Sequence, residues 1–223
     1  MTPRRIGPYA VLRELGARAF TVTYRAEQPR LGRTVLVRAL KPTVDESSPF
    51  AEELAREAAV LARLDHPGVV RLFEFVESKE ASYLVLEDVN GAPLPALTHA
   101  IKLTADQAAA ITLDVARALG HAHERGFVHR ALRPSVVELR EGGAARVVDF
   151  SHATTPRAES LPEPIEVGEP PEHARGTVAA RAAAAAAFVA PEQILGEPLD
   201  ARADVWSLGA LFYTLAAGTP PFV

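Results

Sequence analysis

Apolar and polar side chains alternate in short runs over the first ninety residues, as they do in β-strands that bury one face. Five runs predict strands: 9–15, 21–27, 34–39, 69–77 and 82–88. Between the third and fourth runs, Leu54, Ala58 and Leu61 recur at helical spacing, and Pro49 is suitable for the first turn of a helix. This region therefore predicts five strands and one helix, which ends at the stop formed by residues 66–68.

The rest of the chain has mainly helical periodicity. Residues 90–93 read Asn-Gly-Ala-Pro and interrupt regular structure, so we expect the joint between two domains, 1–89 and 90–223, at this point. Thr104 and Gln107 match a capping box, which predicts a long helix after them. Strands in one half and helices in the other predict an α+β fold.

Two segments near the C-terminal end have unusual composition. Residues 156–172 contain five prolines and five glutamates, which is typical of a disordered linker. The alanine run 182–187 has high helix propensity but no amphipathic pattern, and we interpret it as a low-complexity insertion. By contrast, segment 204–217 is apolar on most of its faces and predicts a helix that is buried on all sides.

Composition excludes several classes of function. The 223 residues have a formal net charge of -4, so no basic footprint for nucleic acid is present. The chain has no cysteine, which excludes disulfides, thiolate metal sites and a cysteine nucleophile. Its longest apolar run, 182–190, is far shorter than the roughly 18–20 residues of a membrane helix. We therefore expect a cytoplasmic protein without a membrane segment or a nucleic-acid partner.

A series of short motifs then occurs in a fixed order. They are Ile6–Tyr9, Leu15–Gly16, Arg33–Arg38, Arg56–Ala58, His66–Pro67, Tyr83–Glu87, His129–Pro134, Asp149–Ser151, Ala190–Glu192, Asp204–Gly209 and Gly218–Phe222. Any one of them is weak evidence, but together they cover nearly the whole chain. The chain resembles the eukaryotic-type serine/threonine protein kinases of bacteria. The resemblance implies a two-lobe fold, with a small lobe of five antiparallel strands and one helix and a mainly α-helical large lobe.

The family has a loop with three glycines after its first strand, where backbone amides approach the nucleotide phosphates. Only Gly16 is present here. Arg18 and Thr21 align with the second and third glycines, and their side chains would occupy the space of the phosphates. This favours an ordinary hairpin turn.

The family's lysine on the third strand aligns with Arg38, and the resemblance pairs it with Glu57. Arginine keeps the charge but does not place it at the same point, so the exchange is not conservative. Lys41 is three residues further on and falls on the opposite face of the strand. Arg18 reaching inward is the alternative source of charge, but we interpret Arg38 and Glu57 as a structural ion pair.

The family's catalytic aspartate, which accepts a proton from the substrate hydroxyl, aligns with Ala131. Its partner lysine aligns with Arg133, a remnant of the site, and the metal-binding asparagine aligns with Val136, which offers no oxygen. Asp149 remains as a weak metal ligand and could equally pair with Arg38. The sequence therefore predicts no catalytic residue.

Two residues at the expected adenine pocket also oppose ATP. Leu36 replaces a small alanine and would fill space that the purine needs, and Glu138 replaces an apolar residue beneath the ring. In contrast, residues at structural positions of the family are retained. They are Leu61, His129, Phe150 and Asp204. We therefore expect the fold to be kept without the chemistry.

The resemblance raises two questions about partners. The activation-segment-like loop 149–192 carries Thr154, Thr155, Ser160 and Thr177. A phosphate on one of these could pair with Arg130, although a solvated linker is the preferred interpretation.

The chain also stops at Val223, just after the motif that follows the family's central large-lobe helix, so the large lobe is expected to be incomplete. This predicts an exposed apolar patch, a partner chain that covers it, or an unstable fragment.

Three hypotheses follow. The first is a catalytically inactive kinase-like domain without a cofactor, which binds an active kinase or an adaptor. The second is a weakly active serine/threonine kinase that uses ATP with Mg²⁺ on the remnants Gly16, Arg18, Arg38, Glu57 and Asp149. The third is a non-functional truncated fragment.

Overall fold

The computed structural model describes residues 3–44, 48–78, 81–154 and 186–222. The chain divides into two compact units. The first comprises residues 1–65 and 70–90, and the second comprises residues 66–69 and 91–223. The short segment 66–69 belongs to the second unit, where the Val147 amide donates to the Gly68 carbonyl over 2.8 Å.

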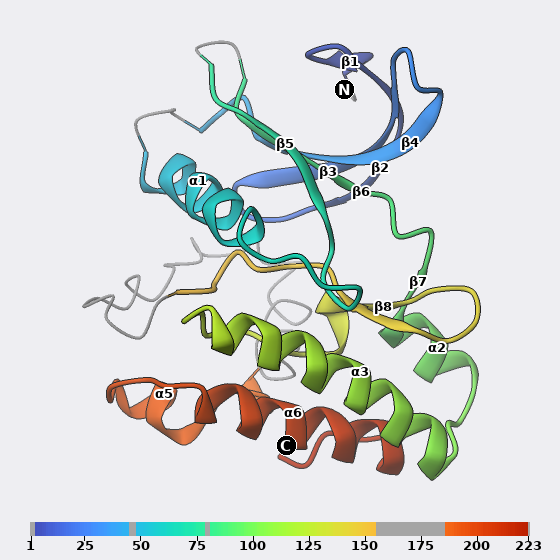
Figure 1. The fold of residues 1–223 in the computed structure, drawn as a ribbon, viewed down its shortest axis with the longest axis vertical. Coiled ribbons are helices and arrows are strands. Elements are labelled where there is room, and N and C mark those ends of the chain that lie inside the picture. Colours follow the sequence, from blue (N-terminus) through green and yellow to red (C-terminus); the bar gives the residue numbers. More distant parts are fainter. Residues whose placement is uncertain (1–2, 45–47, 79–80, 155–185, 223) are drawn as a thin grey trace, which may run out of the picture. The chain divides into compact units, whose positions relative to one another are not determined.

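The first unit contains an antiparallel sheet in the order β1-β2-β3-β4-β6-β5 (Figure 1). Its strands are β1 (Arg5–Ile6), β2 (Tyr9–Ala17), β3 (Thr21–Gln28), β4 (Arg33–Leu40), β5 (Leu72–Val76) and β6 (Tyr83–Glu87). The five predicted strands are present, but the predicted number is one too low because it omits β1. β1 is too short to produce an alternating pattern, and it pairs with β2 across a turn at Gly7, whose φ is +51°.

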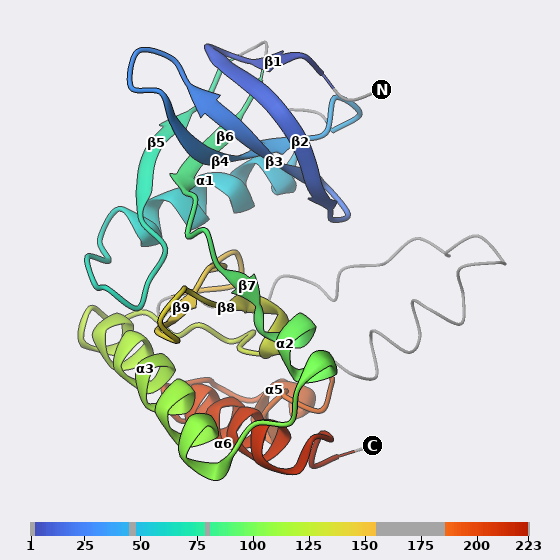
Figure 2. The same cartoon turned by 90° about the vertical axis from the view of Figure 1, so that its right-hand side faces the viewer.

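Helix α1 (Pro49–Leu61) packs against β5 and β6 (Figure 2). Its buried residues are Ala51, Leu54, Glu57, Ala58, Val60 and Leu61, which include the three at the predicted spacing. The helix ends at Leu61, ahead of the stop predicted at His66. The reason is a tightened last turn, in which the amides of Arg63 and Leu64 donate to carbonyls three residues earlier.

The two faces of this sheet differ in chemistry because alternate residues of β4 point in opposite directions. Val37 and Ala39 lie in a cluster of buried apolar side chains that also contains Tyr83. Leu36 and Arg38 therefore lie on the other face. The residues that the sequence assigned to the nucleotide are thus separated by the sheet from its aromatic core.

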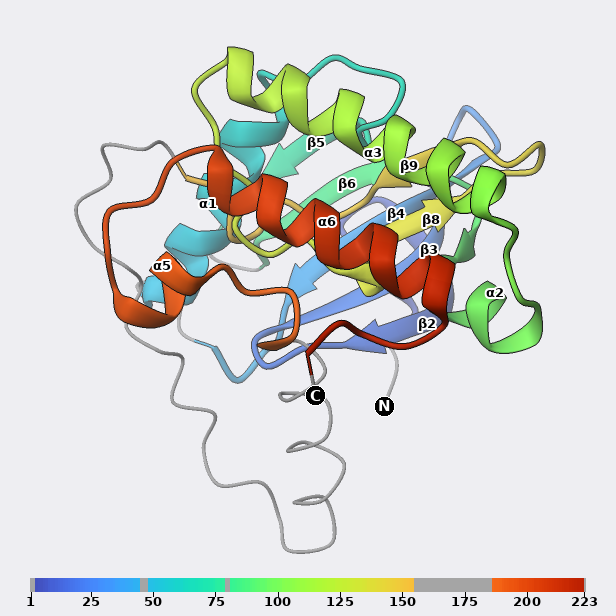
Figure 3. The same cartoon turned by 90° about the horizontal axis from the view of Figure 1, so that it is seen from below.

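The described part of the second unit is mainly helical. Its α-helices are α2 (Leu94–Ala100), α3 (Ala105–Glu124), α5 (Pro191–Leu195) and α6 (Arg202–Ala217). The predicted capping box starts α3: the Gln107 amide donates to the Thr104 hydroxyl, and the Thr104 amide donates to the Gln107 side chain. Helices α3 and α6 lie side by side (Figure 3).

A small sheet completes this unit, in the order β7-β8-β9. Its strands are β7 (Ala92–Pro93), β8 (Val137–Leu139) and β9 (Ala145–Val147). A short 3-10 helix, η1 (Pro134–Val136), precedes β8. The Ala145 amide donates to Asp114 on α3, which fixes β9 against that helix.

One face of α6 exposes large apolar side chains. Val205 is 60% exposed, Tyr213 is 50% exposed, and Trp206 stacks on the exposed Phe222. These residues border a groove of about 580 Å³. The prediction that this helix is buried on all sides is wrong, and the predicted exposed apolar patch is present.

Several predictions concern residues outside the described ranges. They are the linker 156–172, Thr155, Ser160, Thr177, most of the alanine run and Val223. Among the helices that the structure describes, none is both long enough and apolar enough to cross a membrane.

Candidate functional site

The position of the expected phosphate loop is a tight hairpin. Gly16 still belongs to β2, opposite Thr23 of β3, and a side chain added at Gly16 would meet no neighbour within 4 Å. The Arg18 amide donates to the Thr21 carbonyl over 2.8 Å and closes the turn. Arg18 itself is exposed. The predicted hairpin is present, and the absence of phosphate binding by it stays a prediction.

Two further contacts fix this turn. Lys41, just past the end of β4, donates through its amide to Phe20 O and through Nζ to Ala19 O, both over 2.9 Å. The Phe20 ring stacks on Phe50 in the first turn of α1. Carbonyls in the turn are thus bound by a cation of the same unit. The sequence analysis missed these contacts, and the aromatic residue at the tip of the turn was the available signal.

Arg38 and Glu57 form a buried ion pair between β4 and α1. Arg38 is 5% exposed and Glu57 is 2% exposed. Since buried charges are tolerated when they are paired, each residue depends on the other. The predicted ion pair is confirmed. Leu36 lies two residues before Arg38, on the same face of β4, and is also buried.

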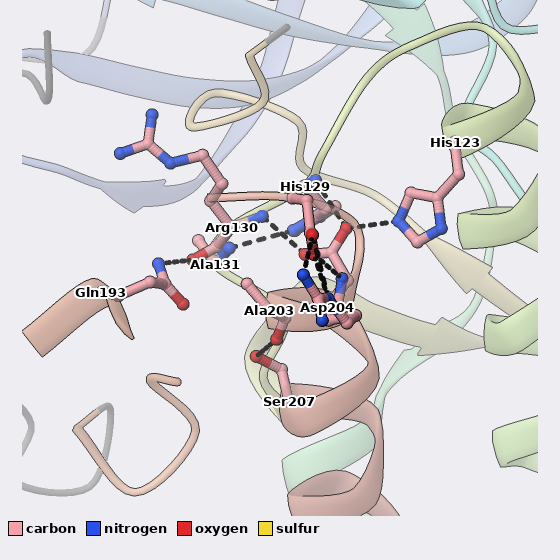
Figure 4. Close-up of polar contacts among 10 residues, drawn as sticks. His123, His129, Arg130, Ala131, Gln193, Ala203, Asp204 and Ser207 are labelled. Carbon is pink, nitrogen blue, oxygen red and sulfur yellow. Dashed lines mark hydrogen bonds and ion pairs between the residues drawn. The ribbon is translucent and has the colours of Figure 1, made fainter. Parts of the chain in front are cut away.

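In the second unit, Asp204 of α6 organises the loop that contains Ala131 (Figure 4). Asp204 accepts the backbone amides of His129 and Arg130 over 2.7 and 2.8 Å. His123 Nε2 of α3 lies 2.7 Å from the same carboxylate. The loop is therefore held to two helices by one buried acid, as the retained Asp204 predicted.

This network shifts two pKa values. Burial alone would raise the pKa of Asp204, but the hydrogen bonds from His123 and from the backbone amides of His129 and Arg130 hold it below its usual range. Burial lowers the pKa of His129, against the opposing charges of Asp204 and Asp149. Asp204 is therefore an anion and His129 is neutral near pH 7, and His129 packs edge-on against Phe150.

The backbone at Arg130 has a left-handed conformation with φ of +66°. A non-glycine residue adopts this conformation at an energetic cost, which surrounding contacts must offset. Here Asp204 binds the Arg130 amide, and Gln193 of α5 donates to the Arg130 carbonyl over 2.9 Å (Figure 4). The loop thus keeps a strained, well-anchored geometry.

The residue presented by this loop is Ala131, which cannot accept a proton. The Arg133 guanidinium donates to the Ala131 carbonyl over 3.2 Å and to the Ser135 hydroxyl over 2.9 Å. Val136 is 1% exposed in η1 and has no donor oxygen. The loop is therefore complete in its backbone but lacks the polar side chains that proton transfer and metal binding require.

Asp149 is 3% exposed, and the Ser151 amide donates to its carboxylate over 3.1 Å. A hard cation such as Mg²⁺ requires several oxygen ligands in octahedral geometry. At the predicted metal positions of this unit, Asp149 offers a carboxylate and Val136 offers nothing. The two residues do not form the pair of ligands that a kinase magnesium site uses.

The expectation for Glu138 needs a correction. Glu138 is only half-buried in β8 and lies directly opposite Arg146 of β9, so it has a cation beside it. The argument that an unpaired buried carboxylate excludes ATP is therefore wrong. The prediction that Leu36 fills space that the purine needs is unaffected.

Thr154 is the described residue among the predicted phosphorylation sites. Its hydroxyl accepts from Arg130 over 3.2 Å, and its backbone pairs with Val128. The Arg130 guanidinium therefore already binds the Thr154 hydroxyl in the unphosphorylated protein. Whether a phosphate is added there stays a prediction.

An antiparallel sheet with one ion-paired helix, followed by a helical unit whose loop is anchored by a buried aspartate, defines the class as an α+β protein kinase fold. The family "Protein kinase domain" matches residues 9–223. The chain therefore belongs to the protein kinase family.

Its similar relatives are bacterial. A Streptomyces coelicolor protein named "Probable serine/threonine-protein kinase" is 32% identical over 99% of this chain and 32% of its own length. The DNA damage-responsive serine/threonine-protein kinase RqkA of Deinococcus radiodurans is 33% identical over 97% of this chain and 31% of its own. The serine/threonine-protein kinase PknB of Mycobacterium leprae is 30% identical over 94% of this chain and 32% of its own length. The chain thus spans about a third of the length of these curated relatives.

Proposed function

We propose that this kinase domain is catalytically inactive and acts as a binding or regulatory module, with a protein such as an active kinase or an adaptor as its partner. The observation that carries the proposal is Ala131, in a loop whose backbone is bound by Asp204 and Gln193, with Asp204 itself held by His123. A loop kept in this geometry without its base is suited to a structural role.

The missing groups account for a large part of the expected rate. A positioned general base contributes roughly 10²–10⁴-fold, which corresponds to about 3 to 5 kcal/mol of activation free energy. The absence of an oxygen at Val136 removes a metal ligand, and the metal neutralises charge that develops during phosphoryl transfer. These losses act on the same step and reinforce one another.

The nucleotide side is altered independently. The Arg18 amide is engaged by the Thr21 carbonyl within the turn, and Leu36 fills the face of β4 that it shares with Arg38. Both features disfavour the phosphates and the purine of ATP. We therefore infer that the protein uses no nucleotide cofactor.

The alternative is a divergent serine/threonine kinase that uses Arg18, Arg38, Glu57 and Asp149 with ATP and one Mg²⁺, without a catalytic base. The retained ion pair favours it, and so do the relatives that are named as kinases. Positioning of the substrates alone retains some rate.

A thermal-shift titration separates the two functions. A ligand at 100 times its Kd stabilises a protein by about 2.7 kcal/mol, which is several degrees of melting temperature for a domain of this size. We expect no shift with millimolar Mg·ATP. A saturable shift that Asp149→Asn abolishes would establish the kinase alternative. The variant Arg13→Gln, on the exposed part of β2, is the control for general charge effects.

A further inference from the structure

A cavity of about 700 Å³ lies within the first unit, on the face of the sheet away from Arg38. Its wall includes Tyr24 of β3, Ala39 of β4 and Tyr83 of β6, which share one face because Ala39 is paired with Tyr83 and all three belong to the same buried cluster. The surrounding strands can be followed in Figure 2. Cavities of this volume are typical of sites for small molecules.

The cavity exists because of residue size. Ala39 is paired with Tyr83 of β6 and with Val22 of β3, and its short side chain leaves the space that a longer one would fill. β1 covers one side of the cavity with Arg5, Ile6 and Gly7.

The two tyrosines place polar atoms at this wall. Tyr24 is 8% exposed and Tyr83 is 4% exposed, yet neither hydroxyl takes part in a hydrogen bond among the described residues. Burial raises the pKa of both, with Glu14 acting on Tyr24 and Glu74 on Tyr83. The hydroxyls therefore stay protonated and available as donors.

The charged residues of the described lining are both cations, Arg5 and Lys41. Arg5 donates to the Pro8 carbonyl over 2.6 Å, and Lys41 Nζ donates to the Ala19 carbonyl over 2.9 Å. A guanidinium has five N–H donors and an ammonium has three, so each retains donors after these bonds. The nearby Glu74 is outside the lining and accepts the Tyr9 hydroxyl.

We propose that this cavity binds a small amphipathic anion. Its carboxylate or phosphate group is held by Arg5 and Lys41, and the hydroxyls of Tyr24 and Tyr83 donate to it. Its apolar body packs on Ile6, Ala39 and Val76. The site does not depend on the inactive phosphoryl-transfer residues, because Ala39 and Arg38 are adjacent on β4 and face opposite sides of the sheet. A ligand bound in this cavity can therefore act on the domain without any catalytic step.

The probe is 8-anilinonaphthalene-1-sulfonate, an amphipathic anion whose fluorescence rises in an apolar site. We expect saturable binding, displaced by decanoate or decyl phosphate but not by decanol. The stronger of the two competitors identifies the head group. Displacement by decanol with equal potency would contradict the role of the cations. The variant Tyr213→Ser is the control for probe that binds in the separate apolar groove on α6.

Two variants test the site itself. Tyr24→Phe/Tyr83→Phe removes only the two hydroxyls, and we expect about tenfold weaker probe binding with an unchanged or higher melting temperature. Ala39→Leu fills the cavity and should abolish this binding. Arg13→Gln, an exposed charge change outside the lining, should leave the affinity unchanged. Unchanged affinity in both site variants would overturn the proposal, even if both fold normally.

Discussion

At the scale of single residues, the protein has the groups that hold the kinase fold together, and alanine and valine stand at positions 131 and 136. Asp204 accepts the backbone amides of His129 and Arg130, so its loss would disturb a whole loop. Ala131 is the next residue in that loop and contributes no polar side-chain atom.

The ion pair between Arg38 and Glu57 gives a direct stability prediction. Glu57→Leu removes the carboxylate that pairs with the buried Arg38 guanidinium and should lower the free energy of unfolding by roughly 3–5 kcal/mol. Arg38→Leu/Glu57→Leu removes both charges and should recover most of that loss. Urea unfolding measures both. Equal losses in the single and double variants would show that packing, and not the buried charge, determines the effect.

His129 gives a prediction for the dependence of stability on pH. Burial lowers its pKa, so the unfolded chain binds a proton below about pH 6.5 while the folded protein does not. The free energy of unfolding should therefore decrease as the pH falls through 6.5, by at most about 1.4 kcal/mol per pH unit from this group. Asp204, whose pKa is also lowered, adds a loss of the same sign near and below pH 4.

Unfolding curves between pH 7 and 5 test this. His129→Phe keeps a ring against Phe150 and should flatten the slope between pH 6.5 and 5.5. The exposed His99 provides the control, and His99→Gln should leave the slope unchanged. An undiminished slope in His129→Phe would assign the acid sensitivity to other groups.

At the scale of elements, the capping box of α3 gives a simple test. Thr104→Ala removes the acceptor for the Gln107 amide and should cost about 1 kcal/mol of stability. Thr104→Ser keeps a hydroxyl and should lose much less. Urea unfolding of the three proteins measures this difference. If Thr104→Ala is as stable as the native protein, the cap contributes nothing to the unit.

The elements with a clear periodic signal were predictable. The strands around β3 and β4, the helices α1 and α3 and the Arg38–Glu57 pair follow from local patterns or from the resemblance. The two-residue β1 and the short strands β7, β8 and β9 do not, because such strands are defined by hydrogen bonds to distant residues. The end of α1 depends on a tightened turn that the amino-acid pattern does not encode.

The same distinction applies to the site. The identities of Ala131 and Val136 can be read directly from the sequence. The cation beside Glu138 could not be, because Arg146 becomes its neighbour only through the register of β8 and β9. The binding of Lys41 to the turn at Ala19 likewise depends on how β4 ends.

At the scale of the whole molecule, the chain combines a protein kinase fold with a loop that presents Ala131 and a short 3-10 helix that contains Val136. It matches the family over residues 9–223 and spans about a third of the length of its relatives. It also presents an apolar face on α6 and a cation-lined cavity in the first unit. These features suit recognition, which is the function proposed for this domain.

The most direct test is incorporation of labelled phosphate from Mg·ATP by the purified protein, with a generic basic protein as the acceptor. We expect incorporation no greater than that of Asp149→Asn. We also expect Ala131→Asp/Val136→Asn to raise the signal only if Arg38→Lys is added. Robust incorporation by the native protein, abolished by Asp149→Asn, would contradict the proposed loss of catalysis.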